Sequence, residues 1–279
     1  MTLSIPTPTP APPAPAPSSA AQAGLYQQLR SHLAALKLAD AAEALPTVLD
    51  QARDEKLTLT AALERLLAIE LAASDARRLA GRLRFACLPT PATLAGFDYD
   101  AAGGVDRALI GELATCRYLD SAANVLLIGP PGTGKTHLAV ALARAAAEAG
   151  YRTYFTSAAD LAARCHRAAI EGRWATTMRF FAGPTLLVID ELGYLPLPAD
   201  AASALFQVVS QRYLKTSIVL TTTNRGVASW GETLGDTTVA AAMLDRLLHR
   251  SVVLNLDGDS YRLRDHHART HTLRTAVGG

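Results

Sequence analysis

The sequence predicts an α/β domain with a five-stranded parallel sheet, preceded by a small all-helical module. Three observations support this fold class. Beyond Pro89 and Pro91, short apolar runs alternate with helical stretches, which is the pattern of parallel βαβ units. Before these prolines, leucines recur at helical spacing, for example Leu25, Leu29 and Leu33. The chain has 279 residues, 49% of them hydrophobic, and is therefore long enough to bury a substantial core.

The first part of the chain divides into a tail and a helical module. Residues 1–23 are mostly Pro, Ala, Thr and Ser, which predicts a disordered tail, or a start of translation assigned too early. Residues 24–92 form the predicted helical module, with a role in binding DNA or a partner. The prolines that follow it mark a linker. Residues 93–279 form the predicted α/β domain.

Five apolar runs are the candidate strands of the sheet. In a parallel sheet the carboxyl ends of the strands lie at one edge, where ligands bind. Each run ends near a residue whose side chain could bind a ligand or take part in a reaction. We therefore expect these ends to converge on one site. The runs are residues 124–128, 152–157, 185–190, 217–223 and 251–256.

A nucleotide phosphate loop follows the first of these runs and precedes a helical stretch rich in Ala and Leu. Its glycines allow backbone N–H groups to wrap around phosphates, and the helix N-terminus adds its positive end. In this motif the lysine reaches the β and γ phosphates and the threonine binds magnesium, which predicts ATP and Mg²⁺ as cofactors. The predicted binding residues are Gly129, Pro130, Pro131, Gly132, Thr133, Gly134, Lys135, Thr136 and His137.

Two adjacent carboxylates end the apolar run 185–190. Asp190 is predicted to hold the magnesium shell through water, together with Thr136. Glu191 is predicted to polarise a water for attack on the γ-phosphate. The alternative is that the pair merely opens a solvated loop.

Three further residues are candidates for catalysis. Asn224 comes directly after the run 217–223. Its amide would lie between the attacking water and the γ-phosphate if that strand lies between the strands 124–128 and 185–190. An ordinary turn residue is the alternative. Arg246 and Arg250 follow Leu244-Asp245, and either could be an arginine finger for a neighbouring subunit, worth roughly 10³ to 10⁵ in rate. Either could instead be a solvated cation at a helix C-terminus.

Composition and missing motifs exclude several classes of protein. The net charge of +2 is too small to indicate by itself that the protein binds nucleic acid. The three cysteines lack the spacing of a metal site or a disulfide framework, which favours a reducing cytoplasm. No apolar stretch reaches the roughly 20 residues of a membrane span. The guanine motif Asn-Lys-x-Asp and the transporter motif Leu-Ser-Gly-Gly-Gln are both absent, and the chain is too short for a two-lobed helicase. The carboxylate pair favours hydrolysis over transfer by a small-molecule kinase.

Between about residues 25 and 264, the sequence resembles the IstB-like transposition helper ATPases, which are close to the DnaC-type helicase loaders within the AAA+ class. The resemblance is carried by residues 124–139, 189–196, 205–213, 244–250 and 258–263. It implies an AAA+ domain in which Asn224 is the first sensor and Arg246 the likeliest finger. It also implies a homo-oligomeric ring or spiral with ATP sites between subunits. The chain departs from the wider AAA+ class in one respect: only a short tail follows the run ending near Leu256, so we expect no full helical lid. Thr222-Thr223-Asn224 stands where the family usually has Thr-Ser-Asn, a mild change that keeps a hydroxyl.

Two groups of arginines are candidates for binding the DNA backbone. The first ends the helical module, and the second follows the run 152–157, where loaders and initiators carry an extra helical element facing a central channel. Phosphate contacts would make binding depend on salt without reading sequence. Solvated helix faces are the alternative. The groups are Arg77, Arg78, Arg82 and Arg84, and Arg164, Arg167, Arg173 and Arg179.

The sequence thus predicts a cytoplasmic ATPase that assembles on double-stranded target DNA with ATP, is released by hydrolysis, and serves a transposase. One alternative is a DnaC-type loader that places a replicative helicase on single-stranded DNA during replication. An alternative of another class is a DNA-bound scaffold that is ordered by nucleotide and does not hydrolyse it. In that scaffold Glu191 would be idle.

Overall fold

The computed structural model describes residues 19–193, 199–222, 230, 236–258 and 260–261. The chain divides into two compact units, residues 1–77 and 78–279, and the division falls within helix α3, Leu59–Ala86. The predicted domain limits at residues 23 and 92 stay predictions. None of the described helices has both the length and the apolar character needed to cross a membrane.

The N-terminal unit consists of helices α1, Ser19–Ala35, and α2, Ala39–Asp54, and the first part of α3. Lys37, with φ +61°, makes the sharp turn between α1 and α2. The unit has a small core of its own, formed by Leu33, Ala41, Ala42, Leu45, Val48 and Leu66. A second set of large apolar side chains is exposed on α1 and α3, among them Leu25, Leu29, Leu59 and Leu71.

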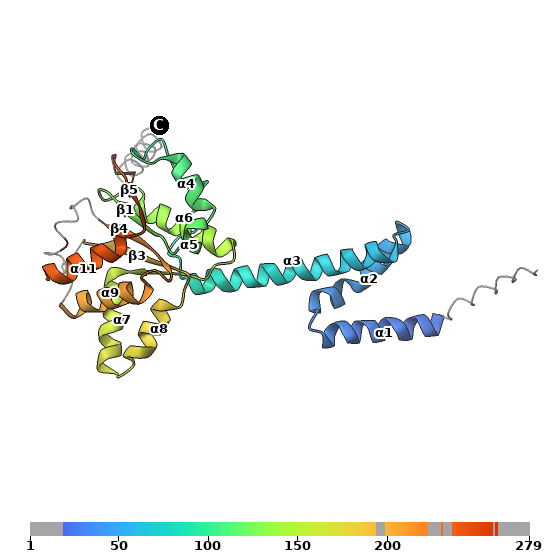
Figure 1. The fold of residues 1–279 in the computed structure, drawn as a ribbon. Helices are drawn as coiled ribbons and strands as arrows, with labels where there is room; N and C mark the ends of the chain where they lie inside the picture. Colours follow the sequence, from blue (N-terminus) through green and yellow to red (C-terminus); the bar gives the residue numbers. More distant parts are fainter. Residues whose placement is uncertain (1–18, 194–198, 223–229, 231–235, 259, 262–279) are drawn as a thin grey trace, which may run out of the picture. The chain divides into compact units, whose positions relative to one another are not determined.

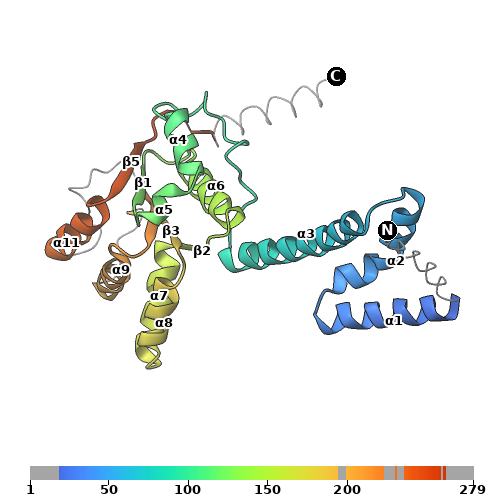
Figure 2. The ribbon, with the colours of Figure 1, turned by 45° about the vertical axis from the view of Figure 1, so that its right-hand side comes forward.

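The C-terminal unit is built around a five-stranded parallel sheet, as predicted, with strand order β2-β3-β4-β1-β5 (Figures 1 and 2). The strands deviate from the predicted ranges by at most two residues where both are described. They are β1, Asn124–Ile128, β2, Thr153–Ser157, β3, Leu186–Leu192, β4, Ser217–Thr222, and β5, Ser251–Asn255.

Helices cover both faces of this sheet (Figure 1). Because side chains alternate along a strand, Leu186 and Val188 pack on the face of α4, α5 and α6, whereas Leu187 and Ile189 pack on the face of α7, α8, α9 and α11. The helices are α4, Arg107–Ala114, α5, Arg117–Asp120, α6, Lys135–Glu148, α7, Ala158–Ile170, α8, Trp174–Ala182, α9, Ala199–Arg212, and α11, Thr237–Leu248.

Strand order determines which strand ends lie together. Strand β4 lies between β3 and β1, so the condition set for the Asn224 hypothesis is met, although Asn224 itself lies outside the described residues. The carboxyl ends of β1, β4 and β3 are adjacent, with Ile128 opposite Thr222 and Ile189 opposite Leu220. Consequently, the phosphate loop and the two carboxylates reach the same edge of the sheet.

Candidate functional site

The phosphate loop connects β1 to α6 and has a backbone that requires glycine at two positions. Gly132 has φ +86° and Gly134 has φ +93°. A Cβ at Gly134 would lie 2.7 Å from a ring carbon of Phe97, and one at Gly132 would lie 2.2 Å from Ser260 Oγ. These glycines therefore serve both the loop conformation and its close contact with the segments around it.

Lys135 is the first residue of α6 and is buried, with 4% of its surface exposed. Its Nζ donates to the Pro130 carbonyl over 2.5 Å, and the Thr133 hydroxyl donates to the same oxygen over 2.9 Å. The loop thus holds the ammonium group at the helix N-terminus, where the helix dipole already favours an anion. A phosphate group fits this environment.

Thr136 and Asp190 meet at the end of the sheet. The Thr136 hydroxyl donates to Asp190 Oδ1 over 3.2 Å, and Asp190 is buried with 5% of its surface exposed. Hydroxyl and carboxylate oxygens are ligands suited to Mg²⁺, which proteins commonly bind together with the phosphates of a nucleotide. The pair therefore fits the magnesium role predicted for both residues.

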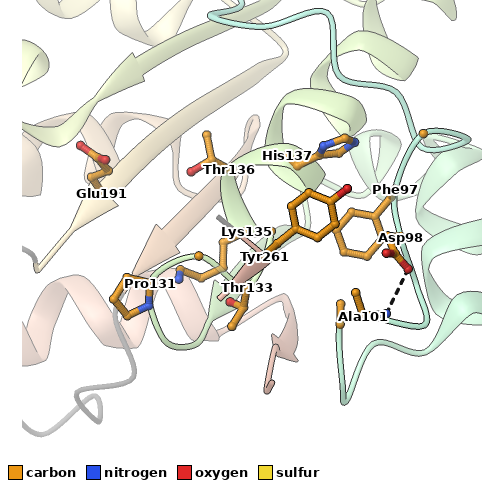
Figure 3. A pocket seen from close by; sticks show the side chains of 14 residues that line it. Phe97, Asp98, Ala101, Pro131, Thr133, Lys135, Thr136, His137, Glu191 and Tyr261 are labelled. Atoms are coloured by element: carbon orange, nitrogen blue, oxygen red, sulfur yellow. Dashed lines mark hydrogen bonds between the residues drawn. The ribbon is translucent and has the colours of Figure 1, made fainter. Parts of the chain in front are cut away.

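Glu191 differs from its buried neighbour because its side chain is exposed and lines a cavity of about 300 Å³. Its φ of +62° lies in the left-handed region, which is unusual for a residue with a side chain. Figure 3 shows its carboxylate at one end of the cavity, with Lys135 and Thr136 between it and the aromatic rings at the other end. This placement is compatible with the predicted role as the base that activates water.

The aromatic end of the cavity was not predicted from the sequence. It is lined by Tyr261, which follows β5, and by Phe97 and Asp98 from the segment between α3 and α4, called the linker from here on (Figure 3). The Tyr261 N–H donates to the Gly132 carbonyl over 3.1 Å, which fixes this segment against the loop. The aromatic residues in the linker and the Gly-Asp-Ser-Tyr-Arg stretch were the available signals, but spacing alone does not bring them together.

His137 holds the linker over helix α6. Its Nε2 lies 3.0 Å from the Thr93 carbonyl, and its ring centroid lies 5.5 Å from that of Phe97. Arg144, two turns further along α6, donates to the Ala92 carbonyl over 3.1 Å. His137 also lines the cavity, so its predicted part in nucleotide binding is combined with positioning Phe97.

Neither candidate finger lines the cavity of its own chain. The Arg246 guanidinium donates to the Ala242 carbonyl over 2.7 Å and lies 4.9 Å from the centre of the Phe206 ring. The Arg250 side chain is exposed.

The first arginine group divides between the two units. In the N-terminal unit, Arg77 pairs with Asp40 and with Glu70. In the C-terminal unit, Arg82 donates to the Ala147 carbonyl over 2.7 Å, whereas Arg78 and Arg84 are exposed. Arg77 and Arg82 therefore have structural partners.

The second group lies on α7 and α8. Arg164 lies 3.8 Å from the centre of the Phe180 ring and donates to the Tyr154 hydroxyl over 3.3 Å. Arg173 pairs with Glu171, while Arg179 donates to the Ala175 carbonyl and the Thr176 hydroxyl within α8. Arg167 is exposed.

Comparison with known proteins agrees with this geometry. The chain is 40% identical over 239 residues to the ATP-binding protein of insertion sequence IS5376 from Geobacillus stearothermophilus, covering 86% of this chain and 95% of that protein. It is 39% identical over 238 residues to the ATP-binding protein of insertion sequence IS21 from Pseudomonas aeruginosa, covering 85% and 89%.

Two solved structures share the fold. AMPPCP-bound DnaA from Aquifex aeolicus matches with a TM-score of 0.50 and 21% identity, covering 62% of this chain and 53% of that one. DnaI matches with a TM-score of 0.50 and 16% identity, covering 60% and 92%. These likenesses confirm the predicted AAA+ fold. Since residues 31–269 also match the family described as IstB-like ATP binding protein, the chain belongs to the IstB-like family.

Proposed function

We propose that this protein is a Mg²⁺-dependent ATPase that assembles on double-stranded target DNA with ATP, is released by hydrolysis, and assists a transposase. The observation that carries the enzymatic part is the arrangement of Lys135, Thr136 and Glu191 around one cavity, with Asp190 bonded to Thr136 beside it. The residues proposed for phosphate binding and for water activation lie at the same edge of the sheet.

The chemistry follows from these positions. Loop N–H groups and Lys135 bind the phosphates. Thr136 and Asp190 would hold Mg²⁺, which when bound would neutralise charge on the phosphate oxygens. Glu191 accepts a proton from the attacking water, whose oxygen forms a bond to the γ phosphorus. The bond from that phosphorus to the bridging oxygen breaks, which leaves ADP and phosphate. At the other end of the cavity, the rings of Phe97 and Tyr261 are placed to stack on the adenine of ATP.

The DNA proposal is best supported at Arg164. Stacking on Phe180 orients its guanidinium, and no carboxylate among the described residues pairs with it. Arg152 likewise lies 4.1 Å from the centre of the Phe85 ring. Stacked guanidinium groups retain N–H donors for phosphate oxygens. Arg77 is the weakest of the eight candidates, since two carboxylates already engage it.

The names of the relatives support a role in transposition, because both proteins are ATP-binding proteins of insertion sequences. A transposase is therefore the proposed partner, and assembly into a homo-oligomer would bring Arg246 or Arg250 to a neighbour's site. A DnaC-type loader remains the second candidate, because the same AAA+ fold occurs in DnaI.

The test is binding of the full chain to double- and single-stranded DNA of equal length, with ATP, with ADP and without nucleotide, at one salt concentration. ATP-dependent preference for duplex is expected. Preference for single-stranded DNA would favour the helicase loader. Equal DNA binding with ATP, with ADP and without nucleotide would favour the scaffold. Lys135→Ala serves as the control, since it should remove the effect of ATP without changing the candidate DNA contacts.

A further inference from the structure

Thr221, on the central strand β4, connects the two carboxylates of the site. Its side chain is buried, with 1% of its surface exposed. Its hydroxyl donates to Asp190 Oδ1 and accepts the backbone N–H of Glu191 over 2.9 Å. A hydroxyl has only one proton to donate, and here that proton is directed at Asp190.

An irregularity in strand pairing explains this contact. Ile189 lies opposite Leu220 and Leu192 lies opposite Thr222, so Asp190 and Glu191 both face Thr221. Two residues opposite one is the count of a β-bulge, a feature that redirects side chains beside active sites. Here it coincides with the left-handed φ of Glu191. The Thr221 hydroxyl, rather than a carbonyl of the sheet, then receives the Glu191 N–H.

We propose that Thr221 is a positioning residue for ATP hydrolysis: it fixes Asp190 Oδ1 and holds the Glu191 backbone in the conformation that directs its carboxylate into the cavity. This inference rests on the proposed function. Without the hydroxyl, the Glu191 N–H loses its acceptor and the bulge loses the bond that ties it to β4. The Glu191 carboxylate then samples other directions, while the phosphate loop is unchanged.

The chain offers a matched control in the next residue. Thr222 is equally buried, and its hydroxyl has no hydrogen-bond partner among the described residues. Thr221→Val and Thr222→Val therefore make the same chemical change on the same strand, and only the first removes a bond to the site. Thr221→Ser keeps the hydroxyl and is the rescuing variant.

The experiment compares these three variants with the wild type in the full chain. It measures ATP affinity with a fluorescent analogue, kcat from phosphate release with Mg²⁺, and amide hydrogen exchange of the segment 186–193. For Thr221→Val we expect kcat to fall at least about tenfold, part of the roughly 10² to 10⁴ that a positioned base supplies, with ATP affinity within about twofold. Exchange at Glu191 should accelerate. Thr221→Ser should regain most of the turnover, and Thr222→Val should resemble the wild type.

Several outcomes would overturn the inference. Unchanged kcat and unchanged exchange in Thr221→Val would show that the hydroxyl positions nothing. Equal losses in Thr221→Val and Thr222→Val, or a parallel loss of ATP affinity, would indicate general damage to the strand. Absence of turnover in the wild type would refute the proposed function and, with it, this role. Normal turnover in both the wild type and Thr221→Val would refute the positioning role alone.

Discussion

The Thr136 hydroxyl donates a hydrogen bond to Asp190 Oδ1 over 3.2 Å, although the two residues are 54 positions apart in the chain. This bond joins the start of helix α6 to the end of strand β3. Since Thr221 donates to the same oxygen, Asp190 is held from two sides. In the proposed function, a carboxylate fixed in this way would hold magnesium without moving.

Lys135→Ala should weaken ATP binding. The buried ammonium group is the main side-chain donor to the phosphates in the proposed complex, and a hydrogen bond to a charged group is worth about 1.5–3 kcal/mol, or roughly 10- to 150-fold in affinity. Titration with a fluorescent ATP analogue measures this change. Lys215→Ala removes an exposed lysine and is the control. Wild-type affinity in the Lys135 variant would rule out the phosphate-loop assignment.

Glu191→Gln should bind ATP normally but turn over slowly. The amide keeps the size of the side chain and cannot accept the proton of the attacking water, so kcat should fall by roughly 10²-fold or more. Because release is proposed to follow hydrolysis, the variant should also remain on duplex DNA with ATP. Phosphate release and DNA dissociation are measured in parallel. Undiminished phosphate release would show that another group activates the water.

The fold and the phosphate-binding half of the site could be predicted because their signals are local. A buried parallel strand is a continuous apolar run, and the phosphate loop encodes its own backbone conformation through the spacing of its glycines. The run 124–128 matches β1 residue for residue. The edge position for the carboxylates then follows from the general property of parallel sheets.

The remaining parts of the site depend on contacts between distant segments. Phe97 lies at the cavity where His137 and Arg144 hold the linker on α6, and Tyr261 lies there where its N–H bonds to the phosphate loop. Thr221 lies in a strand, where threonine is a common residue and therefore gives no signal of function. Its importance arises from the bulge opposite it, which no spacing rule predicts.

Arg212→Met should destabilise the C-terminal unit strongly. The guanidinium is 1% exposed and donates to the carbonyls of Phe181, Pro184, Thr185 and Ser217. Burial lowers its pKa to about 9, which is still above neutral pH, so the group remains charged. Removing it takes these buried hydrogen bonds away, although the Thr185 carbonyl keeps the Ser217 N–H, and should cost about 3 kcal/mol or more in the free energy of unfolding.

Denaturant unfolding measures the effect of Arg212→Met. An exposed arginine provides the comparison: Arg179→Met should change the free energy of unfolding by less than about 0.5 kcal/mol. Equal stability of the two variants would mean that the carbonyls around Arg212 find other donors at little cost.

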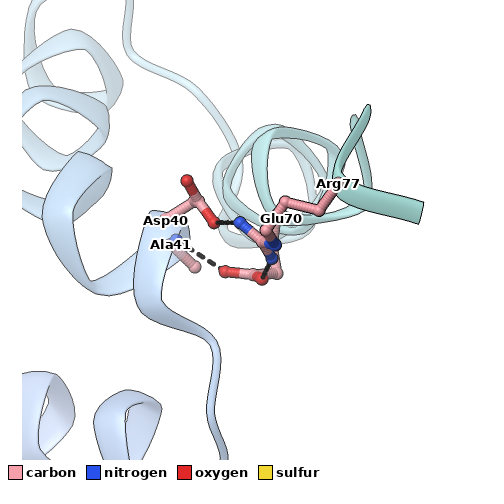
Figure 4. A network of polar contacts seen from close by, with 4 residues as sticks. All are labelled: Asp40, Ala41, Glu70 and Arg77. Carbon is pink, nitrogen blue, oxygen red and sulfur yellow. Dashed lines mark hydrogen bonds and ion pairs between the residues drawn. The ribbon is translucent and has the colours of Figure 1, made fainter. Parts of the chain in front are cut away.

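Glu70→Gln should loosen the N-terminal unit. The buried Glu70 carboxylate accepts the Ala41 N–H over 3.0 Å at the start of α2 and pairs with Arg77, which also pairs with Asp40 (Figure 4). The amide can still accept one bond but loses the charge, which should cost about 1–3 kcal/mol. Hydrogen exchange in the first turn of α2 should accelerate. The exposed Glu43→Gln should leave it unchanged, and equal exchange in both variants would contradict this role.

Arg246→Ala should be inactive alone and regain activity when mixed with Lys135→Ala. The two residues would come from different chains at each proposed site, so a mixed oligomer contains some sites with both an intact finger and an intact phosphate loop. In its own chain, Arg246 stacks on Phe206 and bonds within α11, which holds the guanidinium at the end of that helix. Phosphate release is measured across mixing ratios.

The exposed Arg250 provides the competing assignment. If Arg250→Ala complements Lys135→Ala and Arg246→Ala does not, the finger is Arg250, and the bond from Arg246 to Ala242 has a structural role in α11 instead. If neither variant complements, the sites are not shared between chains. Mixing Glu191→Gln with Lys135→Ala is the control, because both residues line one cavity of one chain. That mixture leaves every site defective and should stay inactive at all ratios.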